Sequence, residues 1–146
     1  MKRYWYKFRV KYGKALDTGK NKKVSEEYLV DAESFTETEK RATKAATELI
    51  GTRDFDITAI SREPTTEILK EDENEGNHWY KTVVSLVTED EDAGVKKFSP
   101  QTIYVNAPST KEADRILRQH MSSSVTEWEI KSIAETKVLG VLGYKQ

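Results

Sequence analysis

Apolar and polar residues alternate with a period of two at the start of the chain. Over residues 4–12, tyrosine, phenylalanine and valine occupy the even positions, and tryptophan, lysine and arginine occupy the odd ones. This alternation, with its high aromatic content, predicts a strand with one buried face. Gly13–Asn21 contains glycine, aspartate and asparagine and predicts a hairpin loop. Val24–Asp31 then predicts the returning strand.

The pattern changes to a helical period after this hairpin. Ser34 and Glu37 have the spacing of a capping box, in which the serine accepts from the backbone three residues on and the glutamate reaches back. Alanine and leucine at helical spacing follow over 42–49, and Gly51 stands where a helix would end. Phe55–Ile60 alternates again and predicts a third strand, so the unit is strand, strand, helix, strand.

The second half of the chain repeats this order. Trp79–Lys81 repeats Trp5–Lys7, and a second capping box begins at Ser109. The repeat predicts strands over Trp79–Val87, Phe98–Asn106 and Val125–Ala134, with one helix before the last of them. Pro100 suggests an edge position or a bulge, and Val138–Leu142 is interpreted as a short apolar tail.

The predicted fold class is α+β, a tandem pseudo-twofold repeat of β-β-α-β units that form antiparallel sheet with one helix per repeat. The two sheets would either join into one or pack face to face. We expect a single domain over 1–146, with repeat one at 1–70, an acidic linker at 71–77 and repeat two at 78–146.

Composition narrows the picture only a little. The chain of 146 residues has no cysteine, which excludes disulfides and thiolate metal sites. Neither a signal peptide nor a run of about 20 apolar residues is seen, so a cytoplasmic location without membrane association is expected. The 24 basic and 25 acidic residues nearly cancel, and the net charge therefore indicates no particular partner.

The sequence offers no constellation that supports an enzyme, a cofactor or a metal. His78 and His120 lack metal-ligand spacing and are interpreted as surface histidines. Asp31 is matched by Asn106 in the second repeat, and an asparagine cannot transfer a proton. The pair is therefore expected to support the helix N-terminus through hydrogen bonds from side chain to backbone.

A basic strand face remains as the candidate site. Cations interleaved with an aromatic ring are typical of proteins that bind single-stranded nucleic acid, because cations contact phosphates while a ring stacks on a base. The candidate residues lie on the first strand and across its hairpin: Trp5, Lys7, Arg9, Lys11, Lys22 and Lys23. The matching face of repeat two keeps Trp79 and Lys81 but loses the other cations.

Three function hypotheses follow. The first is a non-enzymatic binding module that contacts single-stranded nucleic acid or a nucleoprotein complex through this face. The alternative is a protein-interaction or inhibitor module that binds a partner protein through an exposed edge strand. A small-ligand protein that uses the cleft between the repeats is the third. The sequence does not indicate an oligomeric state.

The segment Tyr28–Glu39, together with Trp5–Lys7 and Trp79–Lys81, resembles a domain-of-unknown-function family of gut anaerobes and their phages. The resemblance covers essentially the whole chain, and Thr38 stands where the usual family form has alanine. It implies a small two-repeat α+β protein and an association with phages. The family has no established activity, so the resemblance supplies no catalytic residues.

Overall fold

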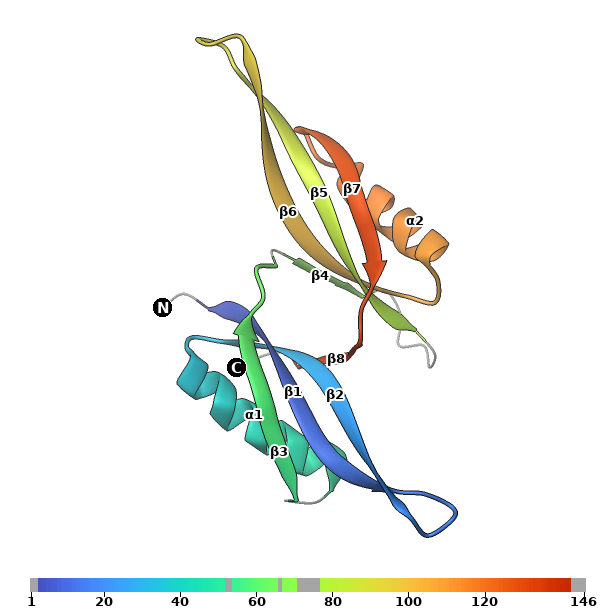
Figure 1. Cartoon of the computed structure of the whole chain (residues 1–146). Helices are drawn as coiled ribbons and strands as arrows, with labels where there is room; N and C mark the ends of the chain where they lie inside the picture. Colours follow the sequence, from blue (N-terminus) through green and yellow to red (C-terminus); the bar gives the residue numbers. More distant parts are fainter. Residues whose placement is uncertain (1–2, 52–53, 66, 71–76, 143–146) are drawn as a thin grey trace. The chain divides into compact units, whose positions relative to one another are not determined.

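The computed structural model describes residues 3–51, 54–65, 67–70 and 77–142. These residues form two helices and eight strands in two four-stranded sheets, which confirms the predicted α+β class (Figure 1). Contacts divide the chain into two units, one of Met1–Pro64 with Lys137–Gln146 and the other of Thr65–Thr136.

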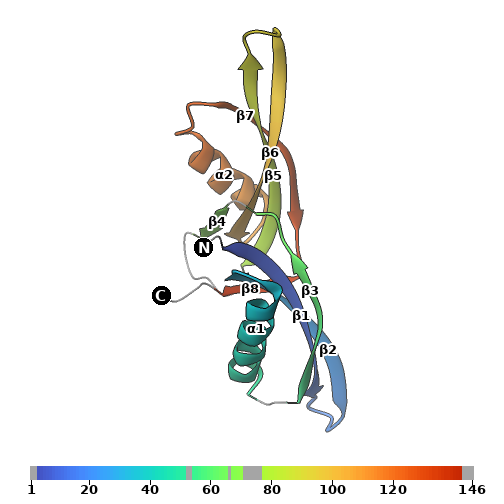
Figure 2. The ribbon, with the colours of Figure 1, turned by 90° about the vertical axis from the view of Figure 1, so that its left-hand side faces the viewer.

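The first unit is built around a long hairpin. Strands β1 (Tyr4–Ala15) and β2 (Asn21–Ala32) pair antiparallel, and β3 (Phe55–Arg62) pairs antiparallel with the other side of β1. Strand β8 (Val138–Leu142) runs parallel to β2, which gives the order β3-β1-β2-β8. Helix α1 (Phe35–Ile50) lies along one face of this sheet (Figure 2).

The second unit has the same construction. Strands β5 (His78–Asp90) and β6 (Val95–Ala107) form its hairpin, and β7 (Glu127–Glu135) pairs antiparallel with β5. The short strand β4 (Glu67–Lys70) runs parallel to β6, and α2 (Thr110–Met121) covers one face of the sheet.

Each core lies between a helix and the sheet beneath it. In the first unit the even positions of β1, such as Phe8 and Val10, are each 1% exposed and pack with Ala42 and Ala46 of α1. In the second unit, a corresponding cluster includes Leu117 of α2. Burial of a side chain such as Phe8 contributes about 1.5–3 kcal/mol, so the alternation seen in the sequence determines which face the helix covers.

Backbone details recur in both units at matching positions. The pairing with the third strand shifts register between Arg9 and Val10 in one unit and between Val83 and Val84 in the other. Both helices begin at an extended serine whose hydroxyl accepts from the backbone three residues on, at 3.1 Å and 3.2 Å. The two units therefore share backbone hydrogen-bonding features as well as the order of their elements.

The short strands β4 and β8 each join the sheet of the other sequence repeat. Strand β4 follows β3 in the chain but pairs with β6, whereas β8 follows β7 but pairs with β2. The sequence analysis did not predict β4 and interpreted β8 as an apolar tail. Each sheet therefore contains one parallel pair in addition to the antiparallel pairs that were predicted.

This exchange sets the unit boundaries near residues 64 and 136, away from the predicted linker. Residues 71–76, which make up most of that linker, lie outside the described residues. Pro100 pairs with Ser85 at a point of β6 beyond the reach of β4, which covers only residues 103–106. At Pro100, the described residues therefore place no strand on the other side of β6. The missing N–H of proline costs no hydrogen bond to such a strand, as expected for proline at an edge.

We predict that Ser34→Ala lowers the free energy of unfolding by about 1 kcal/mol, because the N-cap hydroxyl that accepts from the Glu37 amide is lost. Urea denaturation of both proteins measures the difference. Lys40→Gln, at an exposed position of the same helix, serves as the control and should change stability by less than about 0.5 kcal/mol. Equal effects of the two substitutions would show that the cap makes no specific contribution.

Candidate nucleic-acid interface

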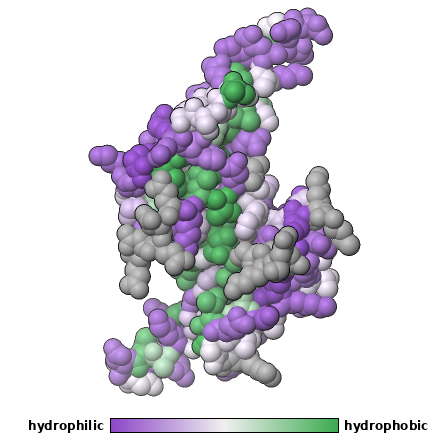
Figure 3. All heavy atoms as spheres, turned by 180° about the vertical axis from the view of Figure 1, so that it is seen from behind, coloured by the Kyte–Doolittle hydropathy of each residue, from purple (hydrophilic) through white to green (hydrophobic). Residues whose placement is uncertain are grey.

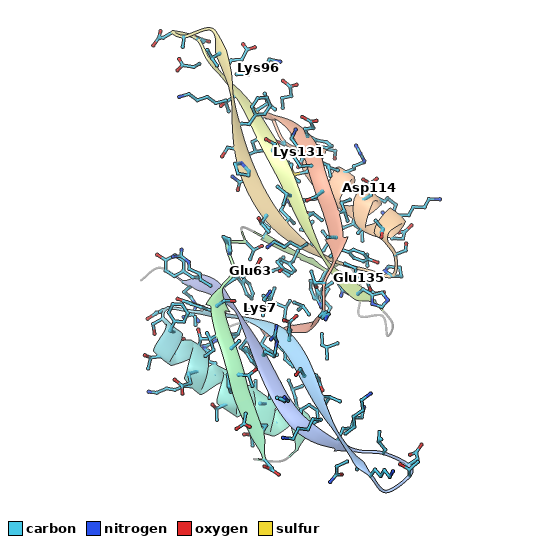
Figure 4. All side chains as sticks on the ribbon, viewed as in Figure 1. Lys7, Glu63, Lys96, Asp114, Lys131 and Glu135 are labelled. Atoms are coloured by element: carbon cyan, nitrogen blue, oxygen red, sulfur yellow. The ribbon has the colours of Figure 1, made fainter. Side chains whose placement is uncertain are left out.

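The strand register places four of the six candidate residues on one face of β1. Tyr6, Phe8 and Val10 pack beneath α1, and successive side chains of a strand point to opposite faces. The remaining positions therefore face away from the helix: Trp5, Lys7, Arg9 and Lys11. Lys7, labelled in Figure 4, is half-buried on this face, as is Trp5, whereas Arg9 and Lys11 are exposed.

Cross-strand neighbours on β2 restrict two of the candidate residues on this face. Arg9 Nη2 lies 3.0 Å from Oε1 of Glu27, its cross-strand neighbour. Trp5 is opposite Asp31, and the fully buried Leu29 lies between these two acidic positions on β2. Trp5 and Arg9 are therefore less available to an anionic partner than the alternation alone suggested.

The far end of the hairpin is strongly basic. We call residues 11–23 the basic arm, and Asp17 is the one acidic residue in that range. The arm carries five exposed lysines: Lys11, Lys14, Lys20, Lys22 and Lys23. Lys23 is opposite Gly13 and shares the face of Lys11, while Lys22 is opposite Lys14 and points to the other face. The candidate lysines thus surround the arm and do not form one flat face.

The matching hairpin of the second unit has the opposite charge. Residues 85–97 correspond to the basic arm through the repeat, and we call them the acidic arm. Four consecutive acidic residues, Glu89–Asp92, outnumber Lys96 and Lys97 there, and Lys97 Nζ lies 3.6 Å from Asp90 Oδ2. Lys96 is labelled near the outer end of this arm in Figure 4, and Figure 3 shows mainly hydrophilic side chains at that end.

Asp31 belongs to a network of charges at the start of α1. Arg3 Nε lies 3.2 Å from Asp31 Oδ2, and Arg41 Nε lies 3.0 Å from Glu37 Oε1. Both arginines also donate to the backbone oxygen of Asp31 at 3.1 Å. The expected hydrogen bond from the Asp31 side chain to the backbone is not what the structure shows, because that carboxylate pairs with arginine instead.

The second unit replaces this charged pair with amides. Asn77 Nδ2 donates to Asn106 Oδ1 at 2.9 Å, and Asn106 Nδ2 donates to the backbone oxygen of His78 at 3.4 Å. Asn106 thus contacts the backbone of the neighbouring strand β5, and not the N-terminus of α2 as expected. Arg3 and Arg41 were missed in the sequence because their pairing with Asp31 depends on the tertiary fold.

Each histidine lies beside a carboxylate at the surface. His78 Nδ1 lies 3.1 Å from Glu135 Oε1, and His120 Nε2 lies 2.5 Å from Glu67 Oε2. Within the described ranges, no group of three or more histidine, cysteine, aspartate or glutamate side chains is placed to hold a metal ion.

Comparison with known families identifies one family over most of the chain. A family model matches residues 4–144, which include both units. The protein belongs to the family described as Domain of unknown function (DUF4494). Neither a curated protein nor a solved structure matches the chain. No helix among the described residues of this DUF4494 protein is long and apolar enough to cross a membrane.

Glu37 gives the charge network a dependence on pH. The hydrogen bond from the Glu33 amide lowers the pKa of Glu37, and Arg3 and Arg41 lower it further. A carboxylate with a lowered pKa stabilises the fold above its ordinary pKa of 4.5, and this stabilisation is lost as the pH falls through the lowered value.

We therefore predict that Glu37→Gln lowers the urea midpoint at neutral pH and that the difference shrinks below pH 4.5. Denaturation at both pH values measures the effect. Glu39→Gln, two residues along on the exposed side of α1, is the matched control and should show a smaller difference at neutral pH. A Glu37→Gln deficit that is independent of pH would exclude an electrostatic origin.

Proposed function

We propose that this DUF4494 protein is a non-enzymatic binding module that captures single-stranded nucleic acid, free or within a nucleoprotein complex, through the basic arm. The observation that supports this proposal is the concentration of five exposed lysines against one aspartate in residues 11–23. The acidic arm has the same position in the repeated construction, so the hairpin itself does not require this positive charge.

Electrostatic capture would take place at the outer end of the hairpin. Lys11, Lys22 and Lys23 make no ion pair among the described residues, so their charges are available to phosphates. Arg9 would contribute less, because Glu27 pairs with it. Trp5, half-buried opposite Asp31, is the remaining candidate for stacking on a base, a contact worth about 1–3 kcal/mol.

Binding through phosphate contacts should weaken steeply with salt. The logarithm of the affinity for a single strand falls by about 0.7 per contact for each unit of the logarithm of salt concentration. Three to five contacts then predict a loss of roughly 20- to 100-fold between about 50 mM and about 200 mM salt. Fluorescence anisotropy of labelled single-stranded DNA and RNA measures this loss, and an absence of binding at the lower salt would refute the proposal.

The repeat supplies a matched pair of variants for locating the contact. Lys22→Glu with Lys23→Glu should reduce affinity by about tenfold or more at low salt, because two attractive charges become repulsive. Lys96→Glu with Lys97→Glu makes the same change in charge on the acidic arm, where Lys97 pairs with Thr88 as Lys22 pairs with Lys14, and should leave affinity within about twofold. Equal losses in both variants would mean that net charge alone drives binding.

A further pair tests the contribution of the strand face. Arg9→Glu with Lys11→Glu alters β1 and leaves Lys22 and Lys23 in place. We expect a loss of affinity smaller than that of the Lys22 and Lys23 variant, because Glu27 already neutralises Arg9.

A stable complex with a partner protein, together with no binding of nucleic acid, would instead support the protein-interaction alternative.

A further inference from the structure

The two helices differ in length although they begin at matching caps. Helix α1 has 16 residues and α2 has 12, counted from the residues after Ser34 and Ser109. Met121, the last residue of α2, therefore corresponds to Ala46, and the final turn of α1 has no counterpart in the second unit. The chain continues there as a turn through Ser122–Ser124.

Two tyrosines occupy the corresponding part of the sheet in the first unit, and Tyr28 belongs to the same core cluster as Ala46. The Tyr28 hydroxyl donates to Glu26 Oε2 at 2.7 Å, and the Tyr12 hydroxyl donates to Oε1 of the same carboxylate. The hydrogen bond to Glu26 raises the pKa of Tyr12, while burial raises that of Tyr28. Both phenols therefore remain protonated donors at neutral pH.

Smaller side chains occupy the corresponding positions of the second unit. The register of β5 and β6 places Leu86, Gln101 and Ile103 where the first unit has Tyr12, Glu26 and Tyr28. Leucine and isoleucine have less volume than tyrosine and no hydroxyl. Neither the two rings nor their hydrogen bonds to a central carboxylate are reproduced.

The short parallel strands β8 and β4 also differ at the residue that pairs with Tyr28 or Ile103. Gly140 of β8 pairs with Tyr28, and a Cβ atom at Gly140 would lie 3.4 Å from the Tyr28 ring. Glu67 of β4 takes the matching place, because it pairs with Ile103. The glycine accommodates a ring in the first unit, whereas the second unit carries a carboxylate at that position.

These differences leave a cavity of about 350 Å³ in the second unit. Leu86, Ile103 and Met121 supply its apolar lining, and Glu67, Gln101 and His120 supply polar groups. The Gln101 side chain makes no hydrogen bond to any described residue. An enclosed apolar cavity of about 150 Å³ can hold benzene, and by volume this cavity, which is open to solvent, has room for a substituted ring.

We propose that this cavity binds a small phenol, with the ring against Leu86 and Ile103 and the hydroxyl donating to Glu67. The first unit provides the template, since it fills the equivalent space with the phenol rings of its own tyrosines hydrogen-bonded to a carboxylate. The half-exposed Glu67 carboxylate supplies the acceptor for this hydroxyl through Oε1, because its Oε2 contacts His120 Nε2. The site lies apart in sequence from the basic arm and is independent of the proposed nucleic-acid binding.

The test is an NMR titration of the full chain with p-cresol, which carries the phenol ring of tyrosine. Methyl resonances of Leu86, Ile103 and Met121 should shift in a saturable way. Toluene, which lacks the hydroxyl, should bind at least about tenfold more weakly, because it cannot donate to the carboxylate. Binding of toluene as tight as that of p-cresol, or no saturable shift of these methyls, would overturn the proposal.

Two variants separate the ring contact from the hydroxyl contact. Ile103→Tyr introduces the residue that fills this space in the first unit and should abolish p-cresol binding. Glu67→Gln should weaken the binding of p-cresol by about tenfold and leave the binding of toluene unchanged. Glu127→Gln, at an exposed position of β7, should change the affinity for neither ligand. Undiminished p-cresol binding in Glu67→Gln would contradict the assigned acceptor, and this result remains decisive if Ile103→Tyr fails to fold.

Discussion

The completion of each sheet by a strand from the other sequence repeat is the constraint on which the architecture depends. Without β8, strand β2 would present unpaired backbone groups along the stretch 27–30, and without β4 the same would hold for β6 at 103–106. Exposed strand edges of this kind are liable to pair with other chains. Because the completing strands are exchanged, neither repeat contains all the residues of its own sheet. Folding must therefore bring together segments far apart in the chain, which is typical of slow-folding topologies.

This shared frame allows the two repeats to diverge in side-chain chemistry. The bulge after Arg9 or Val83 and the serine caps are backbone features, and they are kept in both units. The side chains attached to this frame differ: a charged pair at Asp31 becomes an amide pair at Asn106, and a basic arm becomes an acidic one. Each difference identifies a position where the fold tolerates alternatives, and each repeat thus serves as a control for the other.

The sequence predicted those features that arise from local periodicity. Alternation identified the strands, and serine–glutamate spacing identified both helix starts. Strands β4 and β8 were not predicted because four or five residues carry too little periodicity to indicate a pairing partner. The placement of the candidate residues was predictable only where it follows from alternation, as it does on the face of β1. The pairing of Arg9 with Glu27 and the opposite faces of Lys22 and Lys23 depend on strand register, which the sequence does not give.

The near-zero net charge conceals the most specific electrostatic feature of the chain. Charges at the surface are screened over about 8–10 Å at physiological salt, so a partner responds to the local charge and not to the sum over the whole protein. On β1 that local charge changes along one strand: it is neutralised where Glu27 lies beside Arg9 and is strongly positive from Lys11 outward. The acidic arm carries the opposite sign, so the net charge of the whole chain is no measure of the local charge on the basic arm. A protein with balanced composition can in this way carry a surface that is strongly basic locally.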